Sequence, residues 1–97
     1  MSKFVLYRTA VDDQWIEEEV VAVEYGASFE DVLEDLLQAI RDDLSGAPEY
    51  DNCEVNAYGP DDEYGISSDG YEMTGVVLPP NASENVVVDY VAREVEA

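Results

Sequence analysis

The sequence feature that most constrains the fold is one stretch with helical spacing, between residues 28 and 46. Apolar residues recur there so that, at 100° per residue, they form one stripe: Phe29, Val32, Leu33, Leu36, Leu37, Ile40 and Leu44. Ser28 followed by Asp31 is a variant of the capping box, and Gly46 followed by Pro48 is typical of a helix end. We therefore predict one amphipathic helix, which frays at Asp43 because that carboxylate points towards the apolar stripe.

The rest of the chain favours β-structure. Runs rich in Val and aromatic residues predict strands over 4–9, 15–25, 53–58, 71–78 and 85–95. A helix over 12–24 competes with the second strand, and its Val content favours the strand. Neither parity of that run is uniformly apolar, so we expect a bulge or a late strand start near Glu19, and Gly75 indicates a second bulge.

This order of elements, ββαβββ, defines the expected fold class. We predict a single α+β domain over residues 1–97, in which one main amphipathic helix packs on a mostly antiparallel sheet of four to five strands. Over about the first 45 residues, the hairpin followed by a helix resembles the ubiquitin-like β-grasp in element order. The chain ends Val95-Glu96-Ala97 without a Gly-Gly pair, which disfavours a ubiquitin-like modifier.

Charge decides which functions are compatible with this fold. The 97 residues carry 24 acids and four bases, a formal net charge of −20, yet 46% of them are hydrophobic and seven are Tyr. Acidic disordered tails lack such apolar content, so a folded domain with a very negative surface is expected. Ten acids and no base lie between Arg8 and Arg41, and twelve acids and no base lie between Arg41 and Arg93.

Several classes of function are excluded on these grounds. Direct binding to nucleic acid or to anionic membranes needs Lys and Arg, and no apolar run is long enough to span a bilayer. With no His and one Cys, an internal disulfide and a His/Cys zinc site are both excluded. The N-terminus has no signal-peptide pattern, so a cytoplasmic location in a host cell is expected. No cofactor is predicted.

Catalysis and calcium binding are weighed next. Acid pairs such as Asp12 with Asp13 sit in polar runs, without the apolar pocket that tunes a catalytic carboxyl group, and Cys53 has no His base. We therefore predict that the chain is not an enzyme. The run 61–72 fails as an EF-hand loop because its sixth position is Ile66 instead of Gly, so no metal site is predicted.

The acids themselves then become the candidate site. Acids three, four and eight residues apart on a helix lie about 4.5, 6 and 12 Å apart along its axis, spacings that a phosphate-binding surface accepts. The predicted partner-binding residues are Glu30, Asp31, Glu34, Asp35 and Asp42 on the helix, with Asp61, Asp62, Glu63 and Asp69 as a second patch. Tyr64 and Tyr71 are candidate apolar anchors, with strand packing as the alternative.

In size, charge and folded core, the chain resembles the small acidic DNA-mimic inhibitors of phages and mobile elements. These include anti-restriction proteins, uracil-glycosylase inhibitors and several anti-CRISPR proteins, of which those against type I systems are nearest in length. The resemblance implies binding to a Lys/Arg-rich DNA-binding protein, and for type I systems to a Cascade-type surveillance complex where duplex DNA enters and its PAM is read. The alternative is a halophilic, β-grasp-like housekeeping or adaptor domain whose acids are an adaptation to salt.

Overall fold

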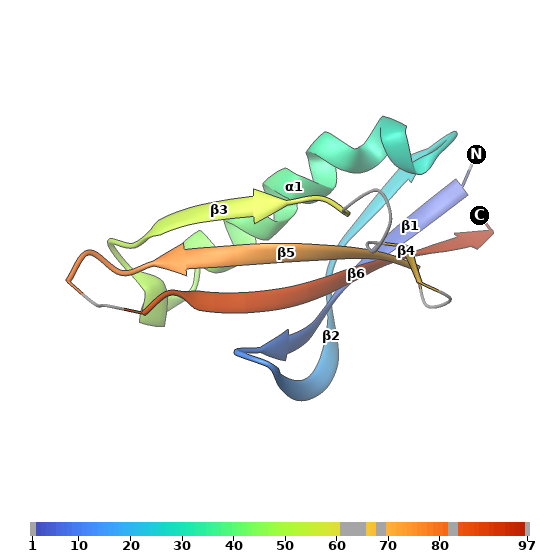
Figure 1. Ribbon diagram of the computed structural model, residues 1–97. Coiled ribbons are helices and arrows are strands. Elements are labelled where there is room, and N and C mark those ends of the chain that lie inside the picture. The colour runs from blue at the N-terminus through green and yellow to red at the C-terminus, as the bar shows by residue number, and fades with distance from the viewer. Residues whose placement is uncertain (1, 61–65, 68–69, 82–83, 97) are drawn as a thin grey trace.

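One helix lies across one face of an antiparallel sheet (Figure 1). The computed structural model describes residues 2–60, 66–67, 70–81 and 84–96. The strands are β1 (Ser2–Val11), β2 (Gln14–Gly26), β3 (Glu54–Tyr58), β4 (Ile66–Ser67), β5 (Gly70–Leu78) and β6 (Val86–Glu96). The helices are α1 (Phe29–Ser45) and the short 3₁₀ helix η1 (Pro48–Tyr50).

The strand order confirms the predicted α+β class. Five strands follow the order β2-β1-β6-β5-β3, and the two-residue β4 pairs with β5 to make six. Every pairing is antiparallel. The predicted order is correct for the helix and the five longer strands, whereas sequence reasoning missed two short elements, β4 and η1. Strands β2 and β3 form opposite edges, so α1 spans the sheet between them.

The turn between β1 and β2 is made by two acids in left-handed backbone conformation. Asp12 has φ 48° and Asp13 has φ 65°, as a two-residue type I′ hairpin requires. The Asp12 N–H donates to the carbonyl of Val87 at 2.7 Å, and the Val87 N–H donates to the Asp12 carboxylate at 3.0 Å. The hairpin end is thereby tied to the start of β6.

The irregularity predicted near Glu19 is confirmed by the β1–β2 register. The pairing passes from Leu6 with Ala22 to Tyr7 with Val20, which leaves one extra residue on β2. A second shift follows Glu19, where three residues of β2 stand against Thr9 alone. Such insertions bend and twist a strand, and they turn the β1–β2 hairpin relative to the rest of the sheet (Figure 1).

The bulge predicted at Gly75 is wrong. Its register continues without a break to both neighbours, Ala57 on β3 and Val88 on β6. A Cβ at this position would lie 2.5 Å from Leu44 Cδ1 and 2.9 Å from Ile40 Cγ2. Glycine is required here because α1 approaches the sheet closely.

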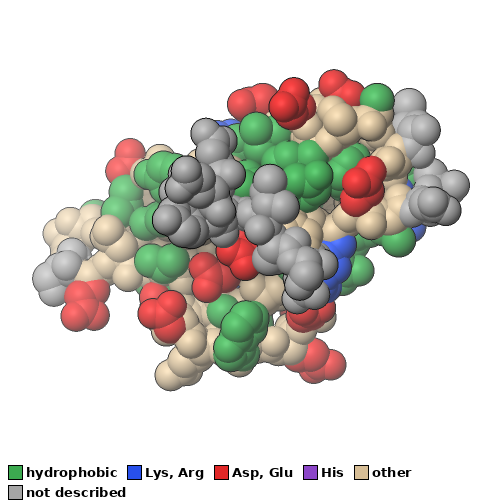
Figure 2. Space-filling model, turned by 45° about the vertical axis from the view of Figure 1, so that its right-hand side comes forward, with side chains coloured by type: hydrophobic (Ala, Val, Ile, Leu, Met, Phe, Trp, Pro, Cys, Tyr) green, Lys and Arg blue, Asp and Glu red, His purple; other side chains and the backbone are tan. Residues whose placement is uncertain are grey.

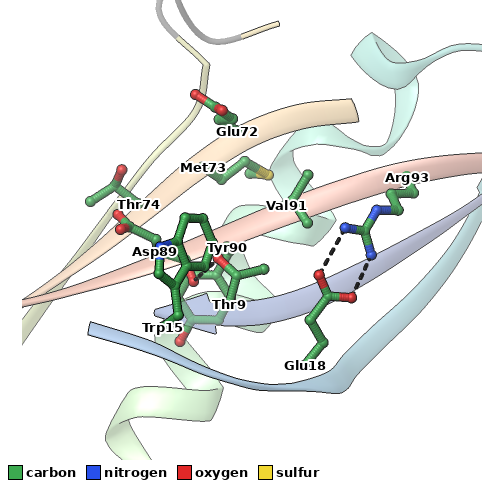
Figure 3. A pocket seen from close by; sticks show the side chains of 10 residues that line it. All are labelled: Thr9, Trp15, Glu18, Glu72, Met73, Thr74, Asp89, Tyr90, Val91 and Arg93. Carbon is green, nitrogen blue, oxygen red and sulfur yellow. Dashed lines mark hydrogen bonds and ion pairs between the residues drawn. The ribbon is translucent and has the colours of Figure 1, made fainter. Parts of the chain in front are cut away.

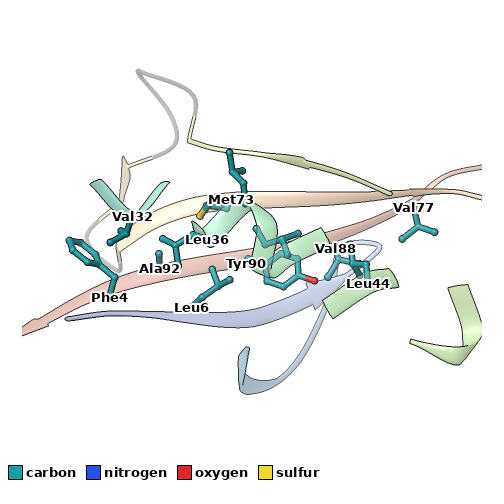
Figure 4. Packing of buried hydrophobic residues seen from close by; sticks show 12 residues of the cluster. Phe4, Leu6, Val32, Leu36, Leu44, Met73, Val77, Val88, Tyr90 and Ala92 are labelled. Atoms are coloured by element: carbon teal, nitrogen blue, oxygen red, sulfur yellow. The ribbon is translucent and has the colours of Figure 1, made fainter. Parts of the chain in front are cut away.

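The core fills the layer between α1 and the sheet (Figure 4). Its buried members come from β1, α1, β5 and β6: Phe4, Leu6, Val32, Leu36, Leu37, Ile40, Leu44, Met73, Val77, Val88, Tyr90 and Ala92. Where α1 begins, the rings of Phe29 and Tyr71 stack with their centroids 3.9 Å apart. Tyr71 therefore packs within the fold, as the alternative reading of this residue expected.

The predicted fraying at Asp43 is wrong, although the predicted direction of its side chain is correct. The helix continues to Ser45. Asp43 accepts hydrogen bonds from Arg8 at 2.8 and 3.1 Å and from the Tyr90 hydroxyl at 2.7 Å. These three bonds satisfy a carboxylate that faces the sheet, so Asp43 is accommodated in the helix and does not end it.

Candidate functional site

The five predicted acids of the helix form one exposed surface, here called the acidic helix face. It consists of Glu30, Asp31, Glu34, Asp35 and Asp42, all exposed. The apolar stripe that binds α1 to the sheet sets this orientation, because residues on the opposite side of the helix must face solvent. The structure thus brings together all five helix positions of the predicted site.

Two of these carboxylates have local partners on α1. Asp31 accepts a hydrogen bond from the Ser28 N–H at 3.2 Å at the helix start, where a negative charge also suits the helix dipole. Asp42 accepts one from the Gln38 amide at 2.9 Å. Asp42 lies in the last turns of a helix that has no base in its final turn, so the dipole disfavours its charge.

The Arg residues are engaged elsewhere. Arg8 binds Asp43 at 2.8 Å and contacts Glu19 at 3.4 Å. Arg93 binds Glu18 at 2.8 and 2.9 Å, and Arg41 donates to Gln38 at 3.1 Å. Within the described ranges, no ion pair reaches the acidic helix face.

The second predicted patch cannot be placed beside the first. Asp61, Asp62, Glu63 and Asp69 lie outside the described residues, as does the candidate anchor Tyr64. The same holds for most of the run tested for calcium binding. In the part of the chain that the structure describes, no group of three or more His, Cys, Asp or Glu side chains is placed to hold a metal ion.

Acids also occur away from α1. Figure 2 shows acidic side chains scattered over the visible face, with few basic ones among them. Glu17 on β2, Glu49 on η1 and Glu54 on β3 are exposed examples. The acidic helix face is therefore one organised part of a surface that is negative in general.

Sequence reasoning missed a second surface, on the side of the sheet away from α1. A hollow of about 220 Å³ opens there, lined by Trp15, Glu18, Glu72, Thr74, Asp89 and Arg93 among others (Figure 3). Burial raises the pKa of Asp89, and the neighbouring Asp13 and Glu72 raise it further. With Thr9 of β1, the residues that line the hollow come from β1, β2, β5 and β6, so only the strand order brings them together.

The cluster of Arg8, Asp43 and Tyr90 lies between α1 and the sheet and acts as a structural tie. Burial raises the pKa of the Tyr90 hydroxyl, and the hydrogen bond to Asp43 adds to this effect. Burial lowers the pKa of Arg8, but its hydrogen bonds to Asp43, together with the charges of Asp43, Tyr90 and Glu19, more than offset burial, so the pKa of Arg8 is raised. Both groups therefore keep their protons, which favours a positioning role over acid–base chemistry.

Comparisons with protein-family models, with curated proteins and with solved structures gave no match to this chain. Along the described residues, no helix combines the length and the apolar character that crossing a membrane requires.

Proposed function

We propose that this protein is a non-enzymatic inhibitor that imitates duplex DNA and occupies the DNA-binding surface of a Lys- and Arg-rich protein. The observation that carries the proposal is the acidic helix face. Its five acids are exposed, and none of them has an ion-pair partner within the described residues.

The energetics of α1 support a role outside the fold. Glu30 with Glu34, and Asp31 with Asp35, are like-charged pairs four residues apart, which cost about 0.2–0.5 kcal/mol each. Asp42 near the helix end costs about 0.3–1 kcal/mol more. A domain with about 5–15 kcal/mol of stability thus gives up on the order of 1 kcal/mol to carry Glu34, Asp35 and Asp42, whereas Glu30 and Asp31 lie in the first turn, where the helix dipole favours their charge.

The contact chemistry follows from the charge. Each carboxylate accepts charge-assisted hydrogen bonds from Lys or Arg side chains of the partner. Along α1 the acids rise by about 1.5 Å per residue, which spreads them over roughly 18 Å, or about five base pairs of a duplex. Association is fast and weakens as salt increases, because screened charges steer the encounter.

The proposed partner is a Cascade-type CRISPR surveillance complex, and the site on it is the channel where duplex DNA enters and its PAM is read. The positive charge of this channel suits the acidic helix face, since such a channel presents basic side chains at phosphate spacing. Restriction enzymes and DNA glycosylases with basic duplex grooves are related targets. In each case the protein binds in place of DNA and performs no reaction.

The test is a competition measurement. A labelled duplex that contains a PAM is bound to a type I surveillance complex, and its anisotropy is followed as the protein is added. We expect full displacement, with the protein concentration needed for half displacement rising in proportion to the duplex concentration. Poly-glutamate serves as the control for bulk negative charge. Binding to the complex that leaves the duplex in place would rule the proposal out.

A second candidate function is a halophilic housekeeping or adaptor domain with β-grasp-like element order. The exposed acids away from α1 favour it, because salt adaptation has no reason to select one face. This candidate differs from the first in one property of the whole molecule. Its fold depends on concentrated salt, whereas an inhibitor must be folded at the ionic strength of its host.

A further inference from the structure

The sheet face away from α1, here called the open face, carries the exposed apolar surface of the molecule. In the described residues, the exposed large hydrophobic side chains are Trp15, Val20, Val23, Tyr25, Tyr58, Val87 and Val95. Register places all seven on this face, because strand neighbours share a side and alternate with core residues. Val20, for example, pairs with Tyr7 and thereby with Val91, whereas the adjacent Leu6 faces the core.

This apolar surface is extensive for a side that nothing in the fold covers. Trp15 is 83% exposed, Val20 59% and Tyr25 58%. Isolated exposed hydrophobics are ordinary, but seven large ones on the same face of one sheet indicate an interaction surface. A sheet covered by a helix on one face, with apolar side chains exposed on the other, can bury that second face under another layer. Helices commonly form such a layer.

The hollow gives the open face its shape and its charge. Trp15 and Glu18 of β2 lie on one side of it, Glu72 and Thr74 of β5 lie on the other, and Asp89 lies between them on β6 (Figure 3). Arg93 sits at the same hollow, bonded to Glu18 and placed over the Tyr7 ring with 4.8 Å to its centroid. Glu72 and Asp89 thus place negative charge beside an exposed aromatic ring.

We propose that the open face binds a basic amphipathic helix of another protein. The apolar side of that helix lies on Val20 and Val23, and its Lys or Arg side chains reach Glu72 and Asp89 in the hollow. Such a helix-on-surface contact is read by apolar anchors at helical spacing. Trp15 at the rim adds a cation–π contact with the same basic side chains.

Charge argues against a second copy of this chain as the occupant. A symmetric dimer places the same patch on both sides of the interface, so the negative charge of Glu72 and Asp89 would lie in one interface with the same charge of the second copy. Each molecule also carries a net charge of −20. Like charges opposed across an interface cost several kcal/mol, whereas a basic helix relieves the repulsion between the two carboxylates.

This inference does not rest on the proposed inhibitor function, since the open face lies on the other side of the sheet from the acidic helix face. The two proposals can fail separately. Substitutions on α1 test the first, and substitutions on β2, β5 and β6 test the second.

Trp15 is the single Trp of the chain and provides the readout. The probe is a synthetic Leu/Lys peptide of about 18 residues that forms an amphipathic helix about 27 Å long. We expect a saturable blue shift of Trp15 emission on titration. Val20→Thr with Val23→Thr, which keeps β-branched side chains, should weaken binding about tenfold. Glu72→Gln with Asp89→Asn should weaken it by a similar factor and reduce its salt dependence. The matched control, Glu49→Gln with Asp51→Asn, changes two exposed acids outside both the open face and the acidic helix face and should leave affinity within about twofold.

Three results would overturn this inference. The first is equal binding by a peptide of the same composition whose Leu and Lys positions are scrambled, because plain charge would then suffice. The second is peptide binding without a shift of Trp15 emission. The third is a concentration-dependent dimer in sedimentation, with a shift of Trp15 emission as the dimer forms. A second copy of the chain would then cover the open face. Circular dichroism checks that each variant is folded.

Discussion

At the scale of single residues, Asp43 shows how one acid in a very acidic chain becomes structural. It accepts two hydrogen bonds from Arg8 and one from Tyr90. We predict that Asp43→Ala lowers the free energy of unfolding by about 2–3 kcal/mol, because it leaves a half-buried guanidinium and a buried hydroxyl without their partner. Urea denaturation measures the loss. Asp42→Ala, one residue earlier and exposed, is the matched control, and an equal effect of both variants would contradict this role.

Gly75 is the second residue whose role depends on the tertiary structure. A Cβ there meets Leu44 and Ile40 of α1. Gly75→Ala should therefore destabilise the fold by about 1–3 kcal/mol, the usual cost of overpacking a core. Gly46→Ala is the control, since its φ of −81° suits any residue and its nearest neighbour, the Asp42 carbonyl oxygen, is 3.1 Å from the added Cβ. Thermal unfolding compares the two variants. The close approach of α1 is refuted if Gly75→Ala is as stable as the wild type.

Asp89 makes the stability depend on pH. Burial raises its pKa in the folded state, with Asp13 and Glu72 adding to the effect. The folded protein thus holds this proton more tightly than the unfolded chain, so the stability that it contributes is present below about pH 4 and is lost as pH rises through the folded-state pKa. Asp89→Asn should raise the melting temperature at about pH 7 and have a smaller effect near pH 4.

The control for this pH dependence is Asp35→Asn on α1, which removes the same charge from an exposed position. Calorimetry at the two pH values gives the comparison. A gain from Asp89→Asn that is the same at both pH values, or no larger than that of Asp35→Asn, contradicts the assignment to Asp89.

At the scale of elements, the sequence predicts those features that are local. The helix α1 and its outward acids follow from a 3.6-residue period, because the stripe of Leu36, Ile40 and Leu44 alone decides which side faces solvent. The five longer strands follow from Val and aromatic content. The open face could not be predicted, because Val occurs on both sides of β2 and β6 and the sequence does not indicate which side α1 covers.

The hollow illustrates the same limit more sharply. Glu18 and Arg93 are 75 residues apart in the chain, and they meet because β1 lies between β2 and β6. The pattern of residues within one strand does not predict the order of the strands in the sheet. The role of Gly75 depends on tertiary structure for a related reason, since its small size allows close contact with α1 and leaves the strand pairing unchanged.

At the scale of the whole molecule, the net charge of −20 makes folding sensitive to salt. If the acids serve a partner, the protein is folded at about 0.1 M KCl, where the Debye length is about 10 Å. Neutralising the three acids of the acidic helix face that lie beyond its first turn, with Glu34→Gln, Asp35→Asn and Asp42→Asn, should then raise its stability by on the order of 1 kcal/mol. Circular dichroism across a KCl series measures both. A wild-type protein that unfolds below molar salt would support the halophilic alternative.

The central claim is that the position of the acids on α1, and not their number, creates the inhibitor surface. Two variants of equal charge separate these properties. Glu34→Lys with Asp35→Lys alters the acidic helix face, and Glu17→Lys with Glu49→Lys alters exposed acids elsewhere. Each pair adds four charges to −20, giving −16.

The measurement is displacement of a PAM-containing duplex from a type I surveillance complex at about 0.1 M salt, by the wild type and by each variant. We expect the α1 variant to displace the duplex at least about a hundredfold less effectively than the wild type, and the other variant to stay within a few-fold of the wild type. Equal displacement by both variants would contradict it, because the helix would then have no special part in binding.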